Sequence, residues 1–249
     1  MGFGNGRESP PRRNVKERAA RMRADHAQCA TFPALMCGSL YECLTTHPGR
    51  RVRPGALVYA MGDLAQSIYF VRRGLVKSSV VSPAGEELIL RMHYAGDILG
   101  ELCLCTGRRR EQAMALEASD VVELLLDDLL ARLRRSPEEM LEFATAVCDH
   151  VGGAYEKLRS LSFDPAMGRL ARELLNLANV LGEPASRGTR IAHYIKQADL
   201  ARLVGVRREV ASGLLNRLRE RQLIGYSRKS RIWVDCDGLQ CLVDAIAPE

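Results

Sequence analysis

No stretch of the chain is apolar for the roughly 18 residues that a membrane-spanning helix requires, so the sequence predicts no membrane contact. The beginning, MGFGNGRESPPRRNVKERAARMR, also lacks the apolar core of a secretory signal. We expect residues 1–25 to form a flexible basic arm, and we expect the protein to be cytoplasmic. In that compartment the eight cysteines would be reduced thiols rather than a disulfide framework.

Signatures of catalysis are missing as well. The sequence has no glycine-rich phosphate loop, no serine-nucleophile elbow and no zinc-protease helix, so nothing in it supports an enzyme. What the chain does have is a globular composition, with 47% hydrophobic and 27% charged residues. Its 249 residues suffice for one large domain or two ordinary ones, with a core in each.

Residues 50–126 show the pattern of short strands separated by turns. Runs rich in β-branched, aromatic and aliphatic residues, such as SIYFVRRG and EELILRMHYAGD, alternate with glycines. Four of these glycines fall eleven or twelve residues apart: Gly62, Gly74, Gly85 and Gly96. Because glycine reaches positive φ without steric cost, it suits such turns. The spacing predicts an antiparallel sandwich or barrel.

A long helix is predicted to begin at Ser136-Pro137. Serine is a good N-cap, proline suits the first helical position, and two glutamates follow at the positive end of the helix dipole. Further along, apolar residues alternate four and three apart, which is the spacing of a coiled-coil seam. We therefore predict a homodimer through Met140, Ala144, Val147, Val151, Ala154, Leu158 and Leu161. A helix lying on its own barrel needs a similar stripe, so this alternative stays open.

A second helix start at Asp164-Pro165 repeats the combination of cap and proline. The domain boundary therefore falls just before it. We predict a sensor barrel over residues 26–135, a dimerisation helix over 136–163 and a C-terminal domain over 164–249.

The C-terminal domain contains QADLARLVGVRREVASGLLNRLRERQLI, which is typical of a short helix, a turn at Gly205 and a second helix. The second helix begins with the outward charges of Arg207, Arg208 and Glu209. Arginine can donate twice to guanine, and glutamate can accept from the amino group of cytosine. The next segment, IGYSRKSRIWV, predicts two strands around a basic turn, a wing that meets phosphates.

Charge supports this interpretation, because residues 201–231 carry nine Lys or Arg and only two acids. A helical hairpin that binds nothing is the plainer alternative. The predicted contacts to double-stranded DNA are Arg207, Arg208, Glu209, Ser212, Arg217, Arg228, Lys229 and Arg231.

A barrel, a long helix with a heptad seam and a winged helix-turn-helix, in this order, resemble the CRP/FNR superfamily of bacterial transcription regulators, and more closely its fumarate–nitrate type. YAGDILGELCL is similar to the family's barrel segment before the effector pocket, and VRREVASGLLNRL to its recognition helix. Glu209 and Ser212 match the fumarate–nitrate type, although Gly213 stands where an arginine is common. Arg208-Glu209 matches the cyclic-AMP receptor branch.

The resemblance implies an α+β fold with an N-terminal jelly-roll barrel like that of cyclic-nucleotide-binding domains, a long dimerisation helix and a C-terminal winged helix-turn-helix. It also implies a homodimer on a palindromic operator, with RNA polymerase as a partner. A cyclic-nucleotide module without DNA binding, as in a kinase or channel subunit, is the rival against which the winged helix argues.

The same resemblance implies an effector pocket at Gly100, Glu101 and Leu102. Members that bind cyclic nucleotides end this segment with Arg-Ser or Arg-Thr, and that arginine pairs with the cyclic phosphate. Here Glu111-Gln112 stands in its place when no gap is introduced, and a carboxylate repels a phosphodiester. A shift of one residue would bring in Arg110. A cyclic nucleotide, another small effector and haem all remain open.

Oxygen-sensing members hold an iron–sulfur cluster with cysteines just before the barrel, where this chain has HAQCATFPALMCGSLYEC. Cys29 and Cys37 reproduce a Cys-x7-Cys interval of that family, and His26 replaces a cysteine. The resemblance therefore implies a cluster held by His26, Cys29, Cys37 and Cys43. The family's distal cysteine would fall near Val122, where none exists, but Cys103 and Cys105 are nearby in sequence and could stand in for it. A colourless thiol switch, haem through His26 or His93, and cysteines that only pack are the alternatives.

Overall fold

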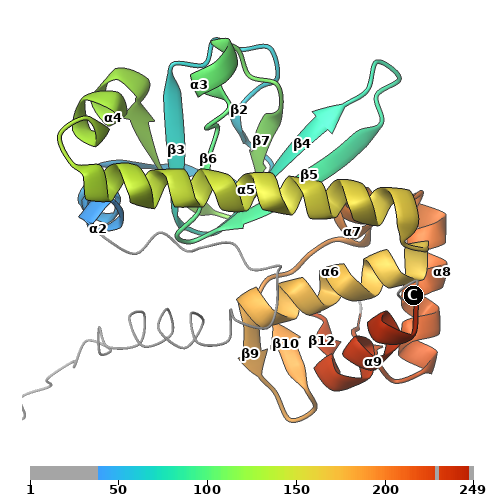
Figure 1. The fold of residues 1–249 in the computed structure, drawn as a ribbon. Coiled ribbons are helices and arrows are strands. Elements are labelled where there is room, and N and C mark those ends of the chain that lie inside the picture. The colour runs from blue at the N-terminus through green and yellow to red at the C-terminus, as the bar shows by residue number, and fades with distance from the viewer. Residues whose placement is uncertain (1–38, 228–229, 247–249) are drawn as a thin grey trace, which may run out of the picture.

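The computed structural model describes residues 39–227 and 230–246. The chain forms a β-barrel, a long helix that runs along one side of it and a second domain on the other side of that helix (Figure 1). Residues His26, Cys29, Cys37, Arg228 and Lys229, and the predicted N-terminal arm, lie outside the described residues.

Two four-stranded antiparallel sheets make the barrel, with strand orders β1-β8-β3-β6 and β2-β7-β4-β5. The first sheet consists of β1 (Gly49–Val52), β8 (Ser119–Leu125), β3 (Ser67–Arg73) and β6 (Ile98–Leu99). The second consists of β2 (Leu57–Tyr59), β7 (Gln112–Ala115), β4 (Leu75–Val81) and β5 (Glu87–Tyr94). The predicted antiparallel β-architecture is confirmed.

Gly74 shows why glycines lie in the turns between these strands. It joins β3 to β4 at a φ of 100°, a value that residues with a side chain rarely adopt. A Cβ there would also lie 2.7 Å from the Cα of Ser119. The close approach of β8 to this turn therefore requires glycine.

Within the described residues, four helices accompany the barrel: α2 (Ser39–Thr46), α3 (Cys103–Thr106), α4 (Leu126–Leu133) and α5 (Pro137–Phe163). The backbone N–H of Glu139 donates to Ser136 Oγ at 3.3 Å, so Ser136 caps α5 as its sequence suggests. Phe143 and Ala146 of α5 are buried against the barrel with Leu40 and Leu44 of α2. Among the described helices, none is long and apolar enough to cross a membrane.

The opposite face of α5 is an exposed apolar stripe of Leu141, Ala144, Cys148, Val151, Tyr155 and Leu158. It shares Ala144, Val151 and Leu158 with the predicted seam, and two further seam residues, Met140 and Ala154, are exposed as well. Val147, however, packs on the barrel core, and Leu161 is half-buried beside Gly205. Because the barrel and the second domain cover Val147 and Leu161 on one side of α5, the free side of this helix is rotated away from those two positions. The dimer contact itself stays a prediction.

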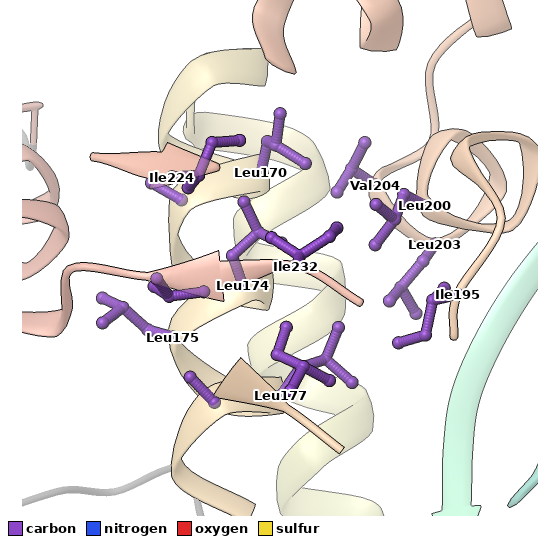
Figure 2. Close-up of a cluster of buried hydrophobic side chains, with 14 of the residues drawn as sticks. Leu170, Leu174, Leu175, Leu177, Ile195, Leu200, Leu203, Val204, Ile224 and Ile232 are labelled. Atoms are coloured by element: carbon purple, nitrogen blue, oxygen red, sulfur yellow. The ribbon is translucent and has the colours of Figure 1, made fainter. Parts of the chain in front are cut away.

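The C-terminal domain consists of α6 (Ala166–Leu181), β9 (Gly182–Pro184), β10 (Thr189–Ile191), α7 (Gln197–Val204), α8 (Arg208–Glu220), β11 (Ile224–Gly225), β12 (Trp233–Val234) and α9 (Cys236–Ile246). Its short strands form one sheet in the order β11-β12-β10-β9. Figure 2 shows leucines of α6 beside Leu200 and Leu203 of α7, Ile224 of β11 and Ile232, which directly precedes β12.

This core continues into the barrel. Leu75, Ile89, Met92 and Tyr94 of β4 and β5 belong to the same buried cluster as the α6 leucines. The two domains are therefore packed directly on one another, and α5 runs along both (Figure 1). The placement of the winged domain relative to the barrel is set by apolar burial as well as by the chain connection.

Candidate nucleic-acid interface and effector site

The helix-turn-helix is built around Gly205. This residue ends α7 with a φ of 65°, the left-handed conformation that glycine adopts most readily, and its N–H donates to Ala201 O. After the turn, α8 buries Ala211, Leu214, Leu215 and Leu218 against the domain core. The inner face of α8 is therefore buried in the domain core, and its outer face is exposed to solvent.

The free face begins with charge. Arg207, Arg208 and Glu209 are all exposed at the N-terminal end of α8, which is the end that a recognition helix inserts into the major groove. Ser212 is half-buried and Arg217 exposed further along. Val210 is 46% exposed beside these charges. An apolar side chain in that position can contact a thymine methyl group.

A basic and aromatic pocket lies beside the wing, with a volume of about 580 Å³. The guanidinium of Arg187 stacks 4.8 Å from the ring of Trp233, and that of Arg219 lies 5.5 Å from the ring of Tyr226. Arg187 also donates to Gln222 at 2.7 Å. Stacked guanidinium groups keep N–H edges free for phosphate oxygens. Arg231 belongs to the same pocket.

Sequence reasoning missed Arg187 and Arg219, because they come from β9–β10 and the end of α8. Only the fold brings these segments to the wing. One sequence signal could have indicated this pocket: the single tryptophan of the chain stands next to the basic wing.

Inside the barrel, the buried guanidinium is that of Arg109. Its side chain lies 4.3 Å from the Tyr59 ring and donates to Gly100 O at 2.9 Å and to Ser67 O at 2.6 Å. Arg110, the residue that we expected to enter the pocket, is exposed. Shortly after α3, Arg108 forms a β-bridge with Leu64, and successive side chains in such an extended segment point to opposite sides. Arg109 therefore points inward and Arg110 outward.

Glu111 also points inward. It is 8% exposed, and the hydroxyl of Tyr59 donates to its carboxylate at 2.9 Å. Burial raises the pKa of Glu111, because an apolar surrounding disfavours the charged form. The alignment without a gap is therefore the one that the structure supports, with a carboxylate where cyclic-nucleotide-binding members have their arginine.

Glu101 connects the barrel to α5. Its carboxylate lies 2.9 Å from Nδ1 of His150 in the middle of that helix. Burial acts to raise the pKa of Glu101, but the hydrogen bond and the charge of His150 outweigh it and hold the pKa below its usual value. Gly100 and Leu102 flank this residue, and Leu102 is 42% exposed.

A cyclic nucleotide does not fit this set of residues. Both terminal nitrogens of Arg109 already donate to backbone carbonyls, and the buried carboxylate of Glu111 stands where cyclic-nucleotide-binding members have their arginine. A phosphodiester would face negative charge without a free bidentate partner. His93, the other haem candidate, is buried, and its Nε2 already lies 3.0 Å from Ser78 Oγ.

Of the predicted cluster ligands, only Cys43 lies among the described residues. It is half-buried in the middle of α2, and Arg132 Nη1 donates to its Sγ at 2.9 Å. The thiol opens on a pocket of about 590 Å³ between α2, α4 and the start of α5. Cys103 is buried and Cys105 exposed, and within the described ranges no three His, Cys, Asp or Glu side chains are grouped as a metal site.

Comparison with known proteins agrees with this geometry. Residues 49–136 match a cyclic nucleotide-binding domain, and residues 168–242 match a Crp-like helix-turn-helix domain. The cyclic AMP receptor protein of Thermus thermophilus is 31% identical over 177 residues, which make up 70% of this chain and 79% of that protein. The anaerobic regulatory protein of Bacillus subtilis is 27% identical over 84% of this chain and 90% of its own length.

A fumarate nitrate reduction regulatory protein from Klebsiella oxytoca is 26% identical over 72% of this chain and 71% of its own. Among solved structures, FixK2 from Bradyrhizobium japonicum shares the fold, with a TM-score of 0.70 at 21% identity over 78% of this chain and 96% of that chain.

The fold and its exposed recognition helix define a transcription regulator that binds DNA through a helix-turn-helix, and not an enzyme. The chain belongs to the CRP/FNR family. The predicted α+β fold, with a cyclic-nucleotide-binding-like barrel, a long helix and a C-terminal winged helix, is confirmed.

Proposed function

We propose that the protein is a cytoplasmic homodimer that binds a palindromic operator and responds to oxygen or redox state through its N-terminal cysteines. The observation that carries the DNA part is the exposed group Arg207, Arg208 and Glu209 at the start of α8, above a buried apolar inner face. RNA polymerase is the partner expected of a regulator bound near a promoter.

The palindromic operator can be tested by selecting bound duplexes from a random pool of double-stranded DNA. A two-fold symmetric protein should enrich inverted repeats whose halves lie about one helical turn apart. Enrichment of a single, unrepeated motif would contradict the symmetric arrangement.

The stripe on α5 supports the dimer. Leu141, Tyr155 and Leu158 are each more than 60% exposed in the single chain, and large apolar side chains in a continuous row are costly in water. A second copy of α5, packed in a coiled coil, would cover them.

The redox part of the proposal rests on residues 26–43. Cys43 fits the role of a sulfur ligand or reactive thiol in one respect: it receives a hydrogen bond from Arg132 and faces a pocket rather than a packed core. Two relatives are named for fumarate–nitrate and anaerobic regulation, which favours the same signal. His26, Cys29 and Cys37 would supply the remaining ligands of an iron–sulfur cluster.

The test compares Cys43→Ser, Cys29→Ser and Cys37→Ser with Cys241→Ser, an exposed cysteine on α9 that serves as the matched control. Protein purified without oxygen should contain iron, and its DNA affinity should change in air. Each of the three variants should lose both properties, and the control should keep both. Colourless wild-type protein whose binding changes with peroxide and recovers with reductant would indicate a thiol switch instead.

A second candidate signal is a small neutral or cationic effector at the barrel. The pair Glu101–His150 favours it, because a ligand that competes for Glu101 would act directly on α5. Calorimetric titration with cyclic AMP should show no binding to the wild type, which would separate this site from that of cyclic-nucleotide receptors.

A further inference from the structure

Lys77 is a buried lysine in the middle of strand β4, with 3% of its side chain exposed. A lysine is expelled from protein interiors unless its charge is paired, since burial of an isolated ammonium is strongly unfavourable. Lys77 is paired twice. Its Nζ lies 2.8 Å from Glu87 Oε1 on the neighbouring strand and 3.0 Å from Asp199 Oδ1 on α7.

The second partner belongs to the other domain. Asp199 stands in the first turn of α7, the helix that precedes the recognition helix, and 7% of its side chain is exposed. One turn further along α7, Arg202 pairs with Glu87 at 3.2 Å and with Asp199 at 3.4 Å. The four side chains form a closed quartet of two cations and two anions, two of them from the barrel and two from α7.

The quartet lies next to the turn that joins α7 to α8. A Cβ on Gly205 would meet Leu161 of α5 at 2.8 Å and Leu88 of β5 at 3.7 Å, so this turn is held against both elements. Because α7 and α8 share a buried interface across the turn, the position of α7 sets the position of α8.

Buried ion pairs of this kind specify geometry more than they add stability. The energy gained by the pair is largely offset by the cost of removing both charges from water. If the two domains separated, water would solvate all four charged groups. The quartet therefore favours one docked arrangement of the domains, but it does not prevent them from separating. What the quartet demands is one relative placement, in which Asp199 meets Lys77.

We propose that the quartet of Lys77, Glu87, Asp199 and Arg202 positions the recognition helix on the barrel and thereby sets the half-site spacing that the dimer accepts. These are positioning residues, because none of them lies at the exposed N-terminal end of α8. The inference rests on the proposed binding of a dimer to two half-sites.

The experiment measures the affinity of the full-length protein for three duplexes. The first is the operator selected by the wild type from a random pool, the second is the same duplex with one base pair inserted at its centre, and the third carries a single half-site. The variants are Lys77→Met and Asp199→Asn, which keep approximate size and remove one charge each. Arg72→Met is the matched control, since Arg72 pairs with Asp120 at 2.6 Å within the barrel.

Lys77→Met and Asp199→Asn should each reduce the preference for the wild-type spacing about tenfold, a typical coupling between two parts of a protein, with little change on the single half-site. The control should keep the preference. Since both changes break the same pair, the double variant should lose no more than either single one.

Equal losses on the operator and on the half-site would show damage to the DNA-binding domain and overturn the proposal. An unchanged preference in both variants, or additive losses in the double variant, would overturn it too. If one variant does not fold, as judged by circular dichroism, the other still decides the question. If the wild type shows no preference for two half-sites over one, the proposed dimeric function has failed and this inference falls with it.

Discussion

At the level of single residues, neighbouring side chains in the loop before β7 have opposite surroundings. Arg110 is exposed, whereas Arg109 and Glu111 are buried in the barrel. Glu111 keeps a hydrogen bond from Tyr59, but this bond does not compensate the burial of its charge, and its pKa is raised. A carboxylate in this condition destabilises the folded state at neutral pH.

Glu111→Gln should therefore stabilise the protein. The pKa of Glu111 is raised on folding, so its carboxyl ionises at a lower pH in the unfolded state than in the folded state. The folded protein therefore loses stability as the pH rises above the ordinary pKa near 4.5. The glutamine keeps an oxygen for Tyr59 and removes the charge. We expect a higher thermal midpoint than in the wild type at pH 7, with the difference shrinking below pH 4.5.

Thermal unfolding of both proteins across this pH range measures the effect. Glu123→Gln is the control, because Glu123 accepts similar bonds from Ser67 and Tyr69 but is exposed. A Glu111→Gln variant that is less stable than the wild type at pH 7 would show that the carboxylate is held by a favourable charge pair.

At the level of elements, we expect α8 and the wing to divide the contact with DNA. Arg208 stands where a side chain can reach base edges, and Arg187 stacks on Trp233 in the pocket by the wing. Base contacts specify sequence, whereas phosphate contacts raise the affinity for all sequences.

Arg208→Ala should weaken operator binding by about 1–3 kcal/mol and relax the preference at one base position. Arg187→Ala should weaken binding to all duplexes alike and reduce the salt dependence of the binding constant by about one unit of slope. Gel shifts on the operator and its single-base variants at several salt concentrations separate the two effects. Identical behaviour of the two variants on every duplex would refute this division.

The stripe of α5 makes a second prediction at this scale. Val151→Glu would place charge at the centre of the exposed row, where a partner helix would bury it unpaired at a cost of several kcal/mol. Sedimentation should then show monomers, while Val151→Ala, which keeps an apolar surface, should stay dimeric. A Val151→Glu variant that remains a dimer would place the interface elsewhere.

At the level of the whole molecule, barrel and winged domain are joined by a shared apolar core and by paired charges. Burial would raise the pKa of Glu87, but hydrogen bonds from Lys77 and Ser79 and the charges of Lys77 and Arg202 outweigh it, and the pKa is lowered. A lowered carboxyl pKa contributes stability that is present above the ordinary value near 4.5 and is lost as the pH falls through the folded-state pKa.

Acid should therefore loosen the contact between the two domains. We expect hydrogen exchange in α7 to accelerate below pH 4.5 relative to the exchange in β3, after correction for the intrinsic pH dependence. In Lys77→Met this acid-dependent increase should be smaller, because much of the charge partner of Glu87 is already gone. The same increase in both proteins would assign the acid effect to other carboxylates.

Much of the fold was predictable from local signals. The glycine intervals indicated a β-barrel, Ser136-Pro137 marked the start of α5, and Gly205 marked the turn of the helix-turn-helix. Each of these signals acts through backbone conformation within a few residues, so no knowledge of the tertiary structure is needed. The outward charges at the start of α8 followed in the same way, because the apolar positions of that helix define its inner face.

Contacts between distant segments were decided by the tertiary structure alone. The heptad pattern of α5 could not distinguish the side that covers the barrel from the side left free, since both are apolar. Arg187 and Trp233 meet only when β9–β10 reaches the wing, and Lys77 meets Asp199 across 122 residues of chain only when the domains dock. The sequence by itself determined which elements form and what charge they carry; packing between them determined which charges are buried together, because that depends on partners that local spacing does not specify.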